Sequence, residues 1–323
     1  MTQARHQPIA LVTGASGFIG PALCERLRTR GWQVRALMRR PVPGPWDTAV
    51  SLDLGRQAIP DDLLAGVATV FHLAGKAHAV AERDGADKEY QIANVLGTRD
   101  LLAAARRHAV RGFVYFSSVK AEASASEGES APSAAPLTPY GRSKHDAERL
   151  LLSGDGVEQT VVLRPALVYG PNPKGYLAQL IRAMRSGWFP PLPDTGNGRS
   201  MIHRDDLADA AIQCASDPRA AGRIFTVTDD IPYSTHHIQM LIRQALGRPE
   251  PGWSLPIGLL TLAARGGDRG ARLLGRRLPF DSEILEKLTG SALYDGTPLR
   301  RELGFRSQRT LQDSIAEMVA TTP

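Results

Sequence analysis

The feature that most constrains the fold is a glycine-rich turn near the start of the chain. Residues 8–13 (PIALVT) form a short apolar run, and the sequence T-G-A-S-G-F-I-G places Gly14, Gly17 and Gly20 directly after it. An amphipathic stretch from residue 18 to residue 30 follows. A buried strand that turns through closely spaced glycines into a helix is typical of a parallel α/β sheet.

The rest of the first half repeats this alternation. Short apolar runs recur at 32–38, 68–73, 112–116 and 160–163, and helical patterns lie between them at 90–108 and 140–152. Buried strands that alternate with helices predict an α/β fold with a doubly wound parallel sheet. The second half has short mixed elements, more proline and no internal repeat. We therefore expect a first domain over 1–165, a smaller mixed α/β lobe over 166–323, and segments near 200–230 that return to the first domain.

The composition is that of a globular protein and excludes a collagenous, disordered or disulfide-scaffold chain. A chain of 323 residues with 42% hydrophobic residues can bury a full core, and its two cysteines, Cys24 and Cys214, predict buried small side chains in a reducing compartment without a metal site. The start of the chain does not resemble a signal peptide, and the longest apolar run, near 259–264, is too short to span a bilayer. We expect a soluble, cytoplasmic protein. The net charge of +6 is dispersed, which favours small anions over nucleic acid.

The glycine turn predicts a phosphate-binding cradle. Glycine lets the backbone turn tightly and approach a pyrophosphate, and the N–H groups at the start of the next helix bind the anion. The turn between a strand and a helix therefore predicts dinucleotide binding, and an ordinary strand-to-helix turn is the alternative. The expected contacts here are Gly14, Gly17, Phe18, Ile19 and Gly20.

The end of the second strand bears on the choice of cofactor. The segment V-R-A-L-M-R-R ends in Arg39 and Arg40 and contains no acid that could hold a ribose 2′-hydroxyl. Arginine there can accept a 2′-phosphate, so NADP(H) is favoured and NAD is possible. Alternatively, the two arginines are a solvated strand end. Asp53, with Leu54 after it, stands in the segment S-L-D-L at 51–54 and is a candidate contact of the adenine amino group.

The predicted chemical centre is the segment Y-G-R-S-K. Tyr140 and Lys144 stand four residues apart, so they share one face of a helix. A phenol ionises near pH 10, but a neighbouring ammonium group and an oxidised nicotinamide both favour the phenolate. Tyr140 can then exchange a proton with a substrate oxygen, and Ser118, at the end of a strand, would donate a second hydrogen bond to that oxygen.

Six motifs occur in an order that resembles the extended short-chain dehydrogenase/reductase family, in its epimerase/dehydratase branch typified by UDP-galactose 4-epimerase. They are T-G-A-S-G-F-I-G, H-L-A-G at 72–75, N-V-L-G-T at 94–98, F-S-S at 116–118, Y-G-R-S-K and R-P-A-L-V-Y-G-P at 164–171. The resemblance implies a Rossmann-like NAD(P)-binding domain, a substrate-binding lobe and a homodimer. It implies that Tyr140 is the general acid and base, that Lys144 holds the nicotinamide ribose and lowers the tyrosine pKa, and that Ser118 is their hydroxyl partner.

The resemblance also implies further contacts. Cofactor contacts would come from Leu73, Ala74, Gly75, Asn94, Tyr140 and Tyr169. Substrate contacts would come from Lys76 and His78, which are alternatively only solvated, and from Arg199 in the segment at 196–210. That arginine would bind the diphosphate of a nucleotide sugar, and a surface arginine is the alternative.

Departures from the pattern narrow the reaction. The dehydratases carry an Asp-Glu pair where this chain has Val119 and Lys120, so a 4,6-dehydratase is disfavoured. The expected function is oxidoreduction at C4 of an NDP-hexose, with UDP as the expected nucleotide, and a 4-ketoreductase is slightly favoured over a UDP-sugar 4-epimerase with tightly bound NAD. A non-catalytic nucleotide-binding subunit and another alcohol or steroid dehydrogenase are further alternatives. The stretch at 255–277 is basic and amphipathic, but glycines interrupt it, so we expect helices that cap the second lobe and not a membrane contact.

Overall fold

The computed structural model describes residues 7–76, 86–122, 138–154, 156–187, 189–275 and 280–323. The chain divides into two compact units, each built from three stretches of sequence. Unit 1 consists of Met1–Ala166, Arg204–Val227 and Asp295–Arg306. Unit 2 consists of Leu167–His203, Thr228–Tyr294 and Ser307–Pro323.

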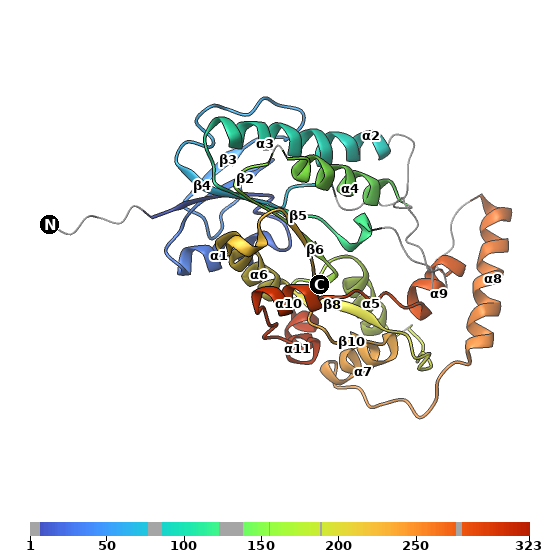
Figure 1. Cartoon of the computed structure of the whole chain (residues 1–323). Helices are drawn as coiled ribbons and strands as arrows, with labels where there is room; N and C mark the ends of the chain where they lie inside the picture. The colour runs from blue at the N-terminus through green and yellow to red at the C-terminus, as the bar shows by residue number, and fades with distance from the viewer. Residues whose placement is uncertain (1–6, 77–85, 123–137, 155, 188, 276–279) are drawn as a thin grey trace. The chain divides into compact units, whose positions relative to one another are not determined.

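A seven-stranded parallel sheet forms the centre of unit 1 (Figure 1). Its strand order is β3-β2-β1-β4-β5-β6-β9, and each neighbouring pair is parallel. The order reverses between β1 and β4, which is where doubly wound sheets bind their ligands. The strands are Ile9–Thr13 (β1), Gln33–Met38 (β2), Thr48–Ser51 (β3), Val67–His72 (β4), Gly112–Phe116 (β5), Gln159–Pro165 (β6) and Arg223–Val227 (β9).

Helices cover both faces of this sheet. In Figure 1, α1 and α6 lie on one side of it, and α3 and α4 lie on the other. This is the doubly wound α/β fold that the sequence predicts. The helices of unit 1 are Gly20–Thr29 (α1), Ala86–Tyr90 (α2), the π-helix Gln91–Leu96 (η1), Gly97–Arg107 (α3), the short 3₁₀ turn Val119–Ala121 (η2), Pro139–Leu152 (α4), Arg204–Ser216 (α6), the 3₁₀ turn Pro218–Ala220 (η3) and Thr297–Leu303 (α10).

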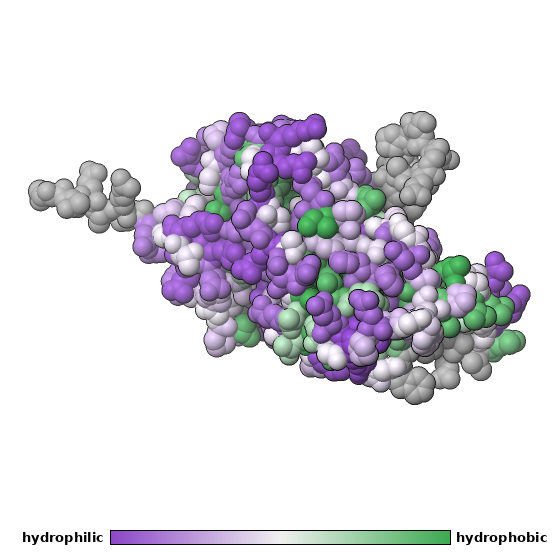
Figure 2. All heavy atoms as spheres, turned by 90° about the horizontal axis from the view of Figure 1, so that it is seen from below, coloured by the Kyte–Doolittle hydropathy of each residue, from purple (hydrophilic) through white to green (hydrophobic). Residues whose placement is uncertain are grey.

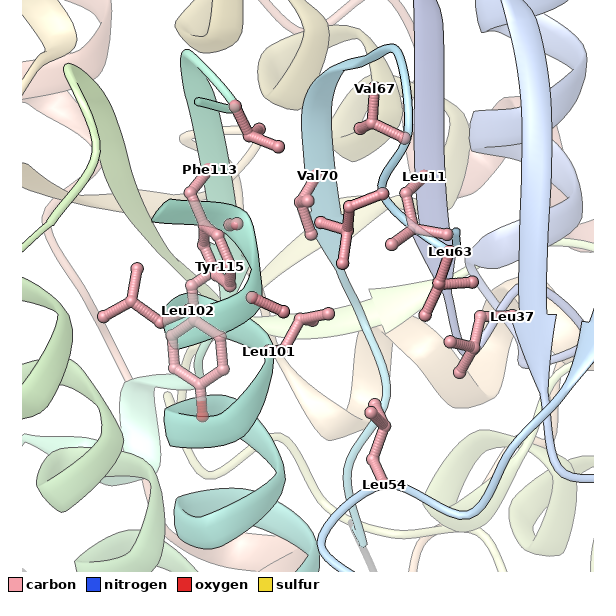
Figure 3. Packing of buried hydrophobic residues seen from close by; sticks show 14 of the residues in the cluster. Leu11, Leu37, Leu54, Leu63, Val67, Val70, Leu101, Leu102, Phe113 and Tyr115 are labelled. Atoms are coloured by element: carbon pink, nitrogen blue, oxygen red, sulfur yellow. The ribbon is translucent and has the colours of Figure 1, made fainter. Parts of the chain in front are cut away.

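The core of unit 1 forms where α3 packs on the sheet. Figure 3 shows Leu101 and Leu102 of α3 beside Val70, Phe113 and Tyr115 of β4 and β5. Each of these side chains is at most 3% exposed. Full burial of side chains of this kind stabilises a fold by about 1.5–3 kcal/mol each, so this layer fixes the strands of the sheet in position.

Unit 2 has a smaller sheet of order β10-β8-β7, in which β7 and β8 are parallel and β10 is antiparallel to β8. Helices α5, α7 and α11 share one hydrophobic core with these strands. The elements are Leu167–Tyr169 (β7), Gly175–Arg185 (α5), Arg199–His203 (β8), Pro232–Tyr233 (β10), Thr235–Ala245 (α7), Ile257–Leu274 (α8), Ser282–Thr289 (α9) and Leu311–Thr321 (α11).

One stretch assigned to the second lobe from the sequence lies in unit 1. Helix α10 packs on β9 through the buried side chains of Leu299 and Leu303. Glu302 forms an ion pair with Arg223 at 2.6 Å, and the amide of Gln213 donates to the carbonyl of Leu303 at 2.6 Å. These contacts join residues 79 and 90 positions apart, which local sequence patterns do not report.

Cys24 and Cys214 are fully buried, as predicted, and burial raises the pKa of each thiol to about 12. Among the described residues, no helix has the length and apolar character needed to cross a membrane.

Candidate active site

The glycine turn lies between β1 and α1 and has the close backbone approach expected of a phosphate cradle. Gly14 has a positive φ of 67°, and a Cβ there would lie 2.8 Å from the backbone nitrogen of Ala74. A Cβ at Gly20 would collide with the carbonyl of Ala15. No side chain caps the start of α1 at Ile19, and its first turn holds no acid. The first N–H groups of the helix are therefore suited to an anion.

A pocket of about 420 Å³ opens beside this turn, within unit 1. It contains eight of the residues predicted to bind a cofactor, namely Gly14, Gly17, Arg39, Asp53, Leu54, Leu73, Ala74 and Gly75. Lys76, predicted as a substrate contact, also lines it, whereas Phe18, Ile19, Gly20, Arg40 and Asn94 do not. The pocket thus collects the carboxyl ends of β1, β2 and β4 around one cavity.

The pocket has lining residues that the sequence analysis missed. Leu37 and Met38 directly precede Arg39 on β2, so the same strand end could have indicated them. Arg56 and Glu89 form an ion pair at 2.5 Å across the pocket rim, and Arg56 also lies 3.7 Å from Asp53. No local pattern predicts that pair, because the two residues are 33 positions apart.

A buried histidine forms hydrogen bonds that connect the strand before the glycine turn to its neighbours. His72 is fully buried; its Nδ1 pairs with the Thr13 hydroxyl at 2.7 Å and its Nε2 with the Thr98 hydroxyl at 2.9 Å. The same Thr13 hydroxyl accepts a hydrogen bond from the backbone of Ala74. Burial and the positive charge of Lys144 lower the pKa of His72 to about 3, so the ring is neutral and acts as a fixed link between β1, β4 and α3.

Ser118, Tyr140 and Lys144 come from two neighbouring elements of unit 1. Ser118 follows β5, and its hydroxyl caps the turn η2 by accepting from the backbone of Lys120. Helix α4 starts at Pro139 because Thr138 caps it: its hydroxyl accepts from the backbone of Gly141 at 3.0 Å. Tyr140 is therefore in the first turn of α4, with Lys144 one turn further along.

Lys144 is only 4% exposed, and its ammonium group is held from two sides. Its Nζ donates to the carbonyl of Phe116 at 2.9 Å and lies 4.7 Å from the centre of the Tyr115 ring. Gly75 passes close by: a Cβ there would lie 3.3 Å from the same nitrogen. Burial lowers the pKa of Lys144 to about 8, and the negative charge of Glu148 opposes this shift.

In the protein without a nicotinamide the pKa of Tyr140 is raised, and the predicted lowering by Lys144 and an oxidised nicotinamide stays a prediction. Burial raises the pKa of Tyr140 above its ordinary value, and a hydrogen bond with Ser118 offsets this only in part. The reason is that the phenolate would lose its hydration, while the Lys144 ammonium group is directed at the carbonyl of Phe116. At neutral pH Tyr140 is therefore a phenol, which is the form that donates a proton.

Glu148 is a functional-site neighbour that the sequence analysis did not single out. It lies one turn beyond Lys144 on α4 and is 1% exposed. Its carboxylate accepts two hydrogen bonds from Arg164, at 2.9 and 2.7 Å, and one from the Ser117 hydroxyl at 2.5 Å. This network ties α4 to the ends of β5 and β6, and so fixes the helix that carries Tyr140 and Lys144.

Asn94 lies fully buried in the π-helix η1 and joins the loop after β4 to α4. Its side chain accepts from the backbone nitrogen of Lys76 at 2.7 Å and donates to the Ser143 hydroxyl at 2.9 Å. Ser143 in turn donates to the carbonyl of Tyr140. Lys76 lies 3.7 Å from the carboxylate of Glu89, so the loop after β4 is also linked to α2 beside the pocket.

The predicted contacts in unit 2 have partners of their own. Tyr169 is fully buried in the core of that unit, and its hydroxyl lies 3.1 Å from Asp229 and 3.0 Å from the carbonyl of Arg309. Its predicted cofactor contact stays a prediction. The Arg199 guanidinium bonds to the carbonyl of Lys287, at the end of α9, and lies 5.2 Å from the Tyr176 ring. Its Nε is buried without a hydrogen-bond partner in the described part of the chain. His78 is outside the described residues.

The unit 1 pocket fits a nicotinamide dinucleotide on its own features. At glycines in its wall, a side chain would collide with neighbouring atoms, so a ligand can approach the backbone closely. The uncapped start of a helix adjoins the pocket, and Arg39 lines it at the end of β2. In addition, the model of the NAD dependent epimerase/dehydratase family matches residues 10–228, which is more than half of the chain. This protein belongs to that family.

Full-length relatives of this epimerase/dehydratase family member carry out more than one reaction. A UDP-glucose 4-epimerase from Vibrio cholerae is 29% identical over 95% of this chain and 93% of its own. A 2-alkyl-3-oxoalkanoate reductase from Stenotrophomonas maltophilia is 28% identical over 97% of this chain and 98% of its own. Among solved structures, MoeE5 in complex with UDP-glucuronic acid and NAD is 27% identical, covers 97% of this chain and 98% of its own, and has a TM-score of 0.72.

The family match and these relatives establish the class of the protein: it is an NAD(P)-dependent enzyme of the extended short-chain dehydrogenase/reductase type, an oxidoreductase or epimerase. The relatives differ in what they act on and in whether they reduce or epimerise. The specific reaction therefore has to be argued from the residues of this chain.

The burial of Lys144 predicts a pH dependence of cofactor binding. The ammonium form is lost as pH rises through about 8, so we expect the affinity for the nicotinamide cofactor to fall above that pH if Lys144 holds the ribose. Calorimetric titrations between pH 6.5 and 9.5 on the wild type and on Lys144→Met test this. The variant should bind weakly at every pH, and an equal alkaline loss of affinity in the variant would contradict the prediction.

Proposed function

We propose that this enzyme uses NADPH to reduce a ketone at C4 of a nucleotide sugar, with UDP as the expected nucleotide. The observation that carries the proposal is the position of Arg39. It lines the unit 1 pocket at the end of β2, where enzymes that prefer NAD place an acid, and a guanidinium there suits a 2′-phosphate. Net reduction draws on NADPH, whereas an epimerase restores its own NAD in each cycle.

In this proposal the residues of the pocket, together with Lys144, which does not line it, divide the cofactor between them. The glycine turn and the start of α1 hold the pyrophosphate, Asp53 and Leu54 border the adenine, and Lys144 binds the nicotinamide ribose. Leu73, Ala74 and Gly75 form the wall that follows β4. When bound, the nicotinamide supplies the hydride that the C4 carbon receives.

The side chains of the chain itself handle the proton. Tyr140 donates its phenolic proton to the C4 oxygen, and Ser118 donates a hydrogen bond to the same atom. The raised pKa of Tyr140 supports this direction, because the residue is protonated when the reaction begins. Arg199 is the proposed diphosphate ligand, and its buried Nε without a partner among the described residues gives that anion a donor.

The alternative is a UDP-sugar 4-epimerase with tightly held NAD. It uses the same Ser118, Tyr140 and Lys144, with the tyrosine taking a proton and then returning it. The relative from Vibrio cholerae is named a UDP-glucose 4-epimerase, and the structure of MoeE5 was solved in complex with NAD. Cofactor preference separates the two proposals, because the epimerase has no use for a 2′-phosphate ligand.

The decisive experiment is a calorimetric titration with NADPH and NADH, after the absorbance of the purified protein has been checked for retained cofactor. We expect the wild type to prefer NADPH, and we expect Arg39→Ala to lose about ten- to a hundredfold in NADPH affinity with little change for NADH, because a charge-assisted hydrogen bond contributes about 1.5–3 kcal/mol.

The neighbouring Arg40→Ala is the matched control, since Arg40 is exposed like Arg39 but does not line the pocket. It should keep the preference for NADPH. Retained NAD, or a preference for NADH in the wild type, would reject the reductase and favour the epimerase. Turnover of a UDP-4-keto-hexose with NADPH then tests the substrate class.

A further inference from the structure

Helix α8 of unit 2 packs on its surroundings along one narrow face. Leu260, Ala264 and Gly267 are buried and follow one another at helical spacing. A Cβ at Gly267 would collide with the carbonyl of Phe280, so this face is pressed against the chain that leads into α9. The expectation that glycines interrupt this stretch is wrong, because α8 is continuous over Ile257–Leu274. The packing of the stretch on unit 2 therefore uses only one face of the helix.

The opposite side of α8 exposes large hydrophobic residues. Leu259 is 54% exposed, Leu262 is 64% exposed and Leu273 is 86% exposed. Trp253 (61%) and Ile257 (45%) precede them at the start of the helix. These five are the majority of the large hydrophobic side chains exposed in the described part of the chain, and they fall within 21 consecutive positions.

Arginines flank this apolar strip. Arg265, Arg269 and Arg272 are exposed and, at 100° per residue, project to one side of the line through Leu262 and Leu273. The acid within this stretch, Asp268, lies beside this row: its carboxylate accepts from the backbone and the hydroxyl of Ser282, at 3.1 and 2.6 Å, and of the three arginines only Arg272 contributes to lowering its pKa. We call the exposed side the α8 outer face and define it by Leu259, Leu262, Arg265, Arg269, Arg272 and Leu273.

Figure 2 shows hydrophobic and hydrophilic residues side by side at the right of the view, where Figure 1 places α8. The apolar part of the face runs from Leu259 to Leu273, about 21 Å along the helix at 1.5 Å per residue. A strip of that length, with cations beside it, has the form of a helix that lies in the plane of a bilayer surface. None of the described helices is able to span one.

We propose that the α8 outer face binds the surface of an anionic phospholipid bilayer, so that catalysis takes place next to a membrane. The leucines would enter the boundary between headgroups and acyl chains, where burial of apolar area is favourable. The arginines would lie at the level of the lipid phosphates, to which each contributes about 1 kcal/mol, or about fivefold in affinity. This inference does not depend on which reaction the enzyme catalyses.

Charge favours a lipid surface over a second copy of the chain. Two copies paired through this face would bring two sets of three arginines together, and the face has no acid to compensate them. Like charges brought together in an interface cost several kcal/mol. An anionic surface satisfies the apolar and the basic parts of the face at once.

Vesicle co-sedimentation of the full-length protein tests the proposal. The vesicles are phosphatidylcholine alone and phosphatidylcholine mixed with phosphatidylglycerol. We expect binding to the mixed vesicles that weakens with salt, and little binding to the neutral ones. Arg265→Gln combined with Arg269→Gln should reduce the affinity about 25-fold. Leu262→Gln combined with Leu273→Gln should reduce it about tenfold or more.

Matched variants separate this face from the general basic charge of the protein. Arg107→Gln with Arg149→Gln removes two exposed charges from unit 1, and Ile231→Gln with Leu293→Gln removes two exposed hydrophobic residues elsewhere in unit 2. Both controls should bind as the wild type does. All altered side chains are exposed, and melting temperatures compare the fold of each variant with the wild type.

Three results would overturn the proposal. The first is no binding to the anionic vesicles at low salt. The second is an equal loss of binding in the control variants. The third is self-association of the wild type, measured by analytical ultracentrifugation, that Leu262→Gln with Leu273→Gln abolishes, because that result would assign the face to a second copy of the chain.

Discussion

Replacement of Tyr140 by phenylalanine is expected to lower kcat about a thousandfold, within the hundred- to ten-thousandfold that a positioned proton donor contributes. The substitution keeps the ring, which lies 5.8 Å from the ring of Tyr90, and removes only the hydroxyl that hydrogen-bonds with Ser118. Cofactor affinity should stay close to that of the wild type, because the substitution leaves the ring, Lys144 and the pocket beside the glycine turn in place. Steady-state kinetics and calorimetry measure the two effects separately.

Tyr90→Phe is the control for this variant. It removes a second hydroxyl from the same pair of rings, and it should leave kcat nearly unchanged because Tyr90 has no proposed part in proton transfer. A Tyr140→Phe enzyme that keeps most of its turnover would reject the mechanism. Equal losses in the two variants would point instead to a general disturbance around α2 and α4.

The local part of this architecture is readable from the sequence. Each of its features depends on only a few consecutive residues: the turn at Gly14, the strand end at Arg39, and the spacing of Tyr140 and Lys144. The backbone geometry of strand, turn and helix fixes the positions within each feature. For this reason the parallel sheet and the pocket beside β1, β2 and β4 follow from pattern alone.

The features that the sequence does not predict depend on contacts between distant positions. Arg56 enters the pocket because it pairs with Glu89, and Asp295–Arg306 joins unit 1 because α10 packs on β9. The π-helix that contains Asn94 has no recognisable pattern in the amino-acid sequence. The burial that raises the pKa of Tyr140 in the protein alone can be judged only from the folded chain.

Glu148 is the second residue for which we expect a large effect. Glu148→Ala should lower the free energy of unfolding by about 3–5 kcal/mol, because it leaves the partly buried Arg164 guanidinium with only the more distant Glu122 carboxylate, at 3.7 Å, and the Ser117 hydroxyl without its acceptor. Chemical denaturation with two spectroscopic probes measures this loss. Arg149→Ala, on the exposed side of the same helix, is the control and should change stability by less than about 0.5 kcal/mol.

The double variant Glu148→Ala/Arg164→Met decides how the network acts. If most of the loss in Glu148→Ala comes from an unpaired buried charge, removal of that charge should restore part of the stability, and the two effects will not add. Glu148 also raises the pKa of Lys144, so both variants should shift the alkaline loss of cofactor affinity to lower pH. Additive losses of stability with no change in that pH profile would show that Glu148 neither balances Arg164 nor positions the charge of Lys144, and that α4 is held in place by apolar packing alone.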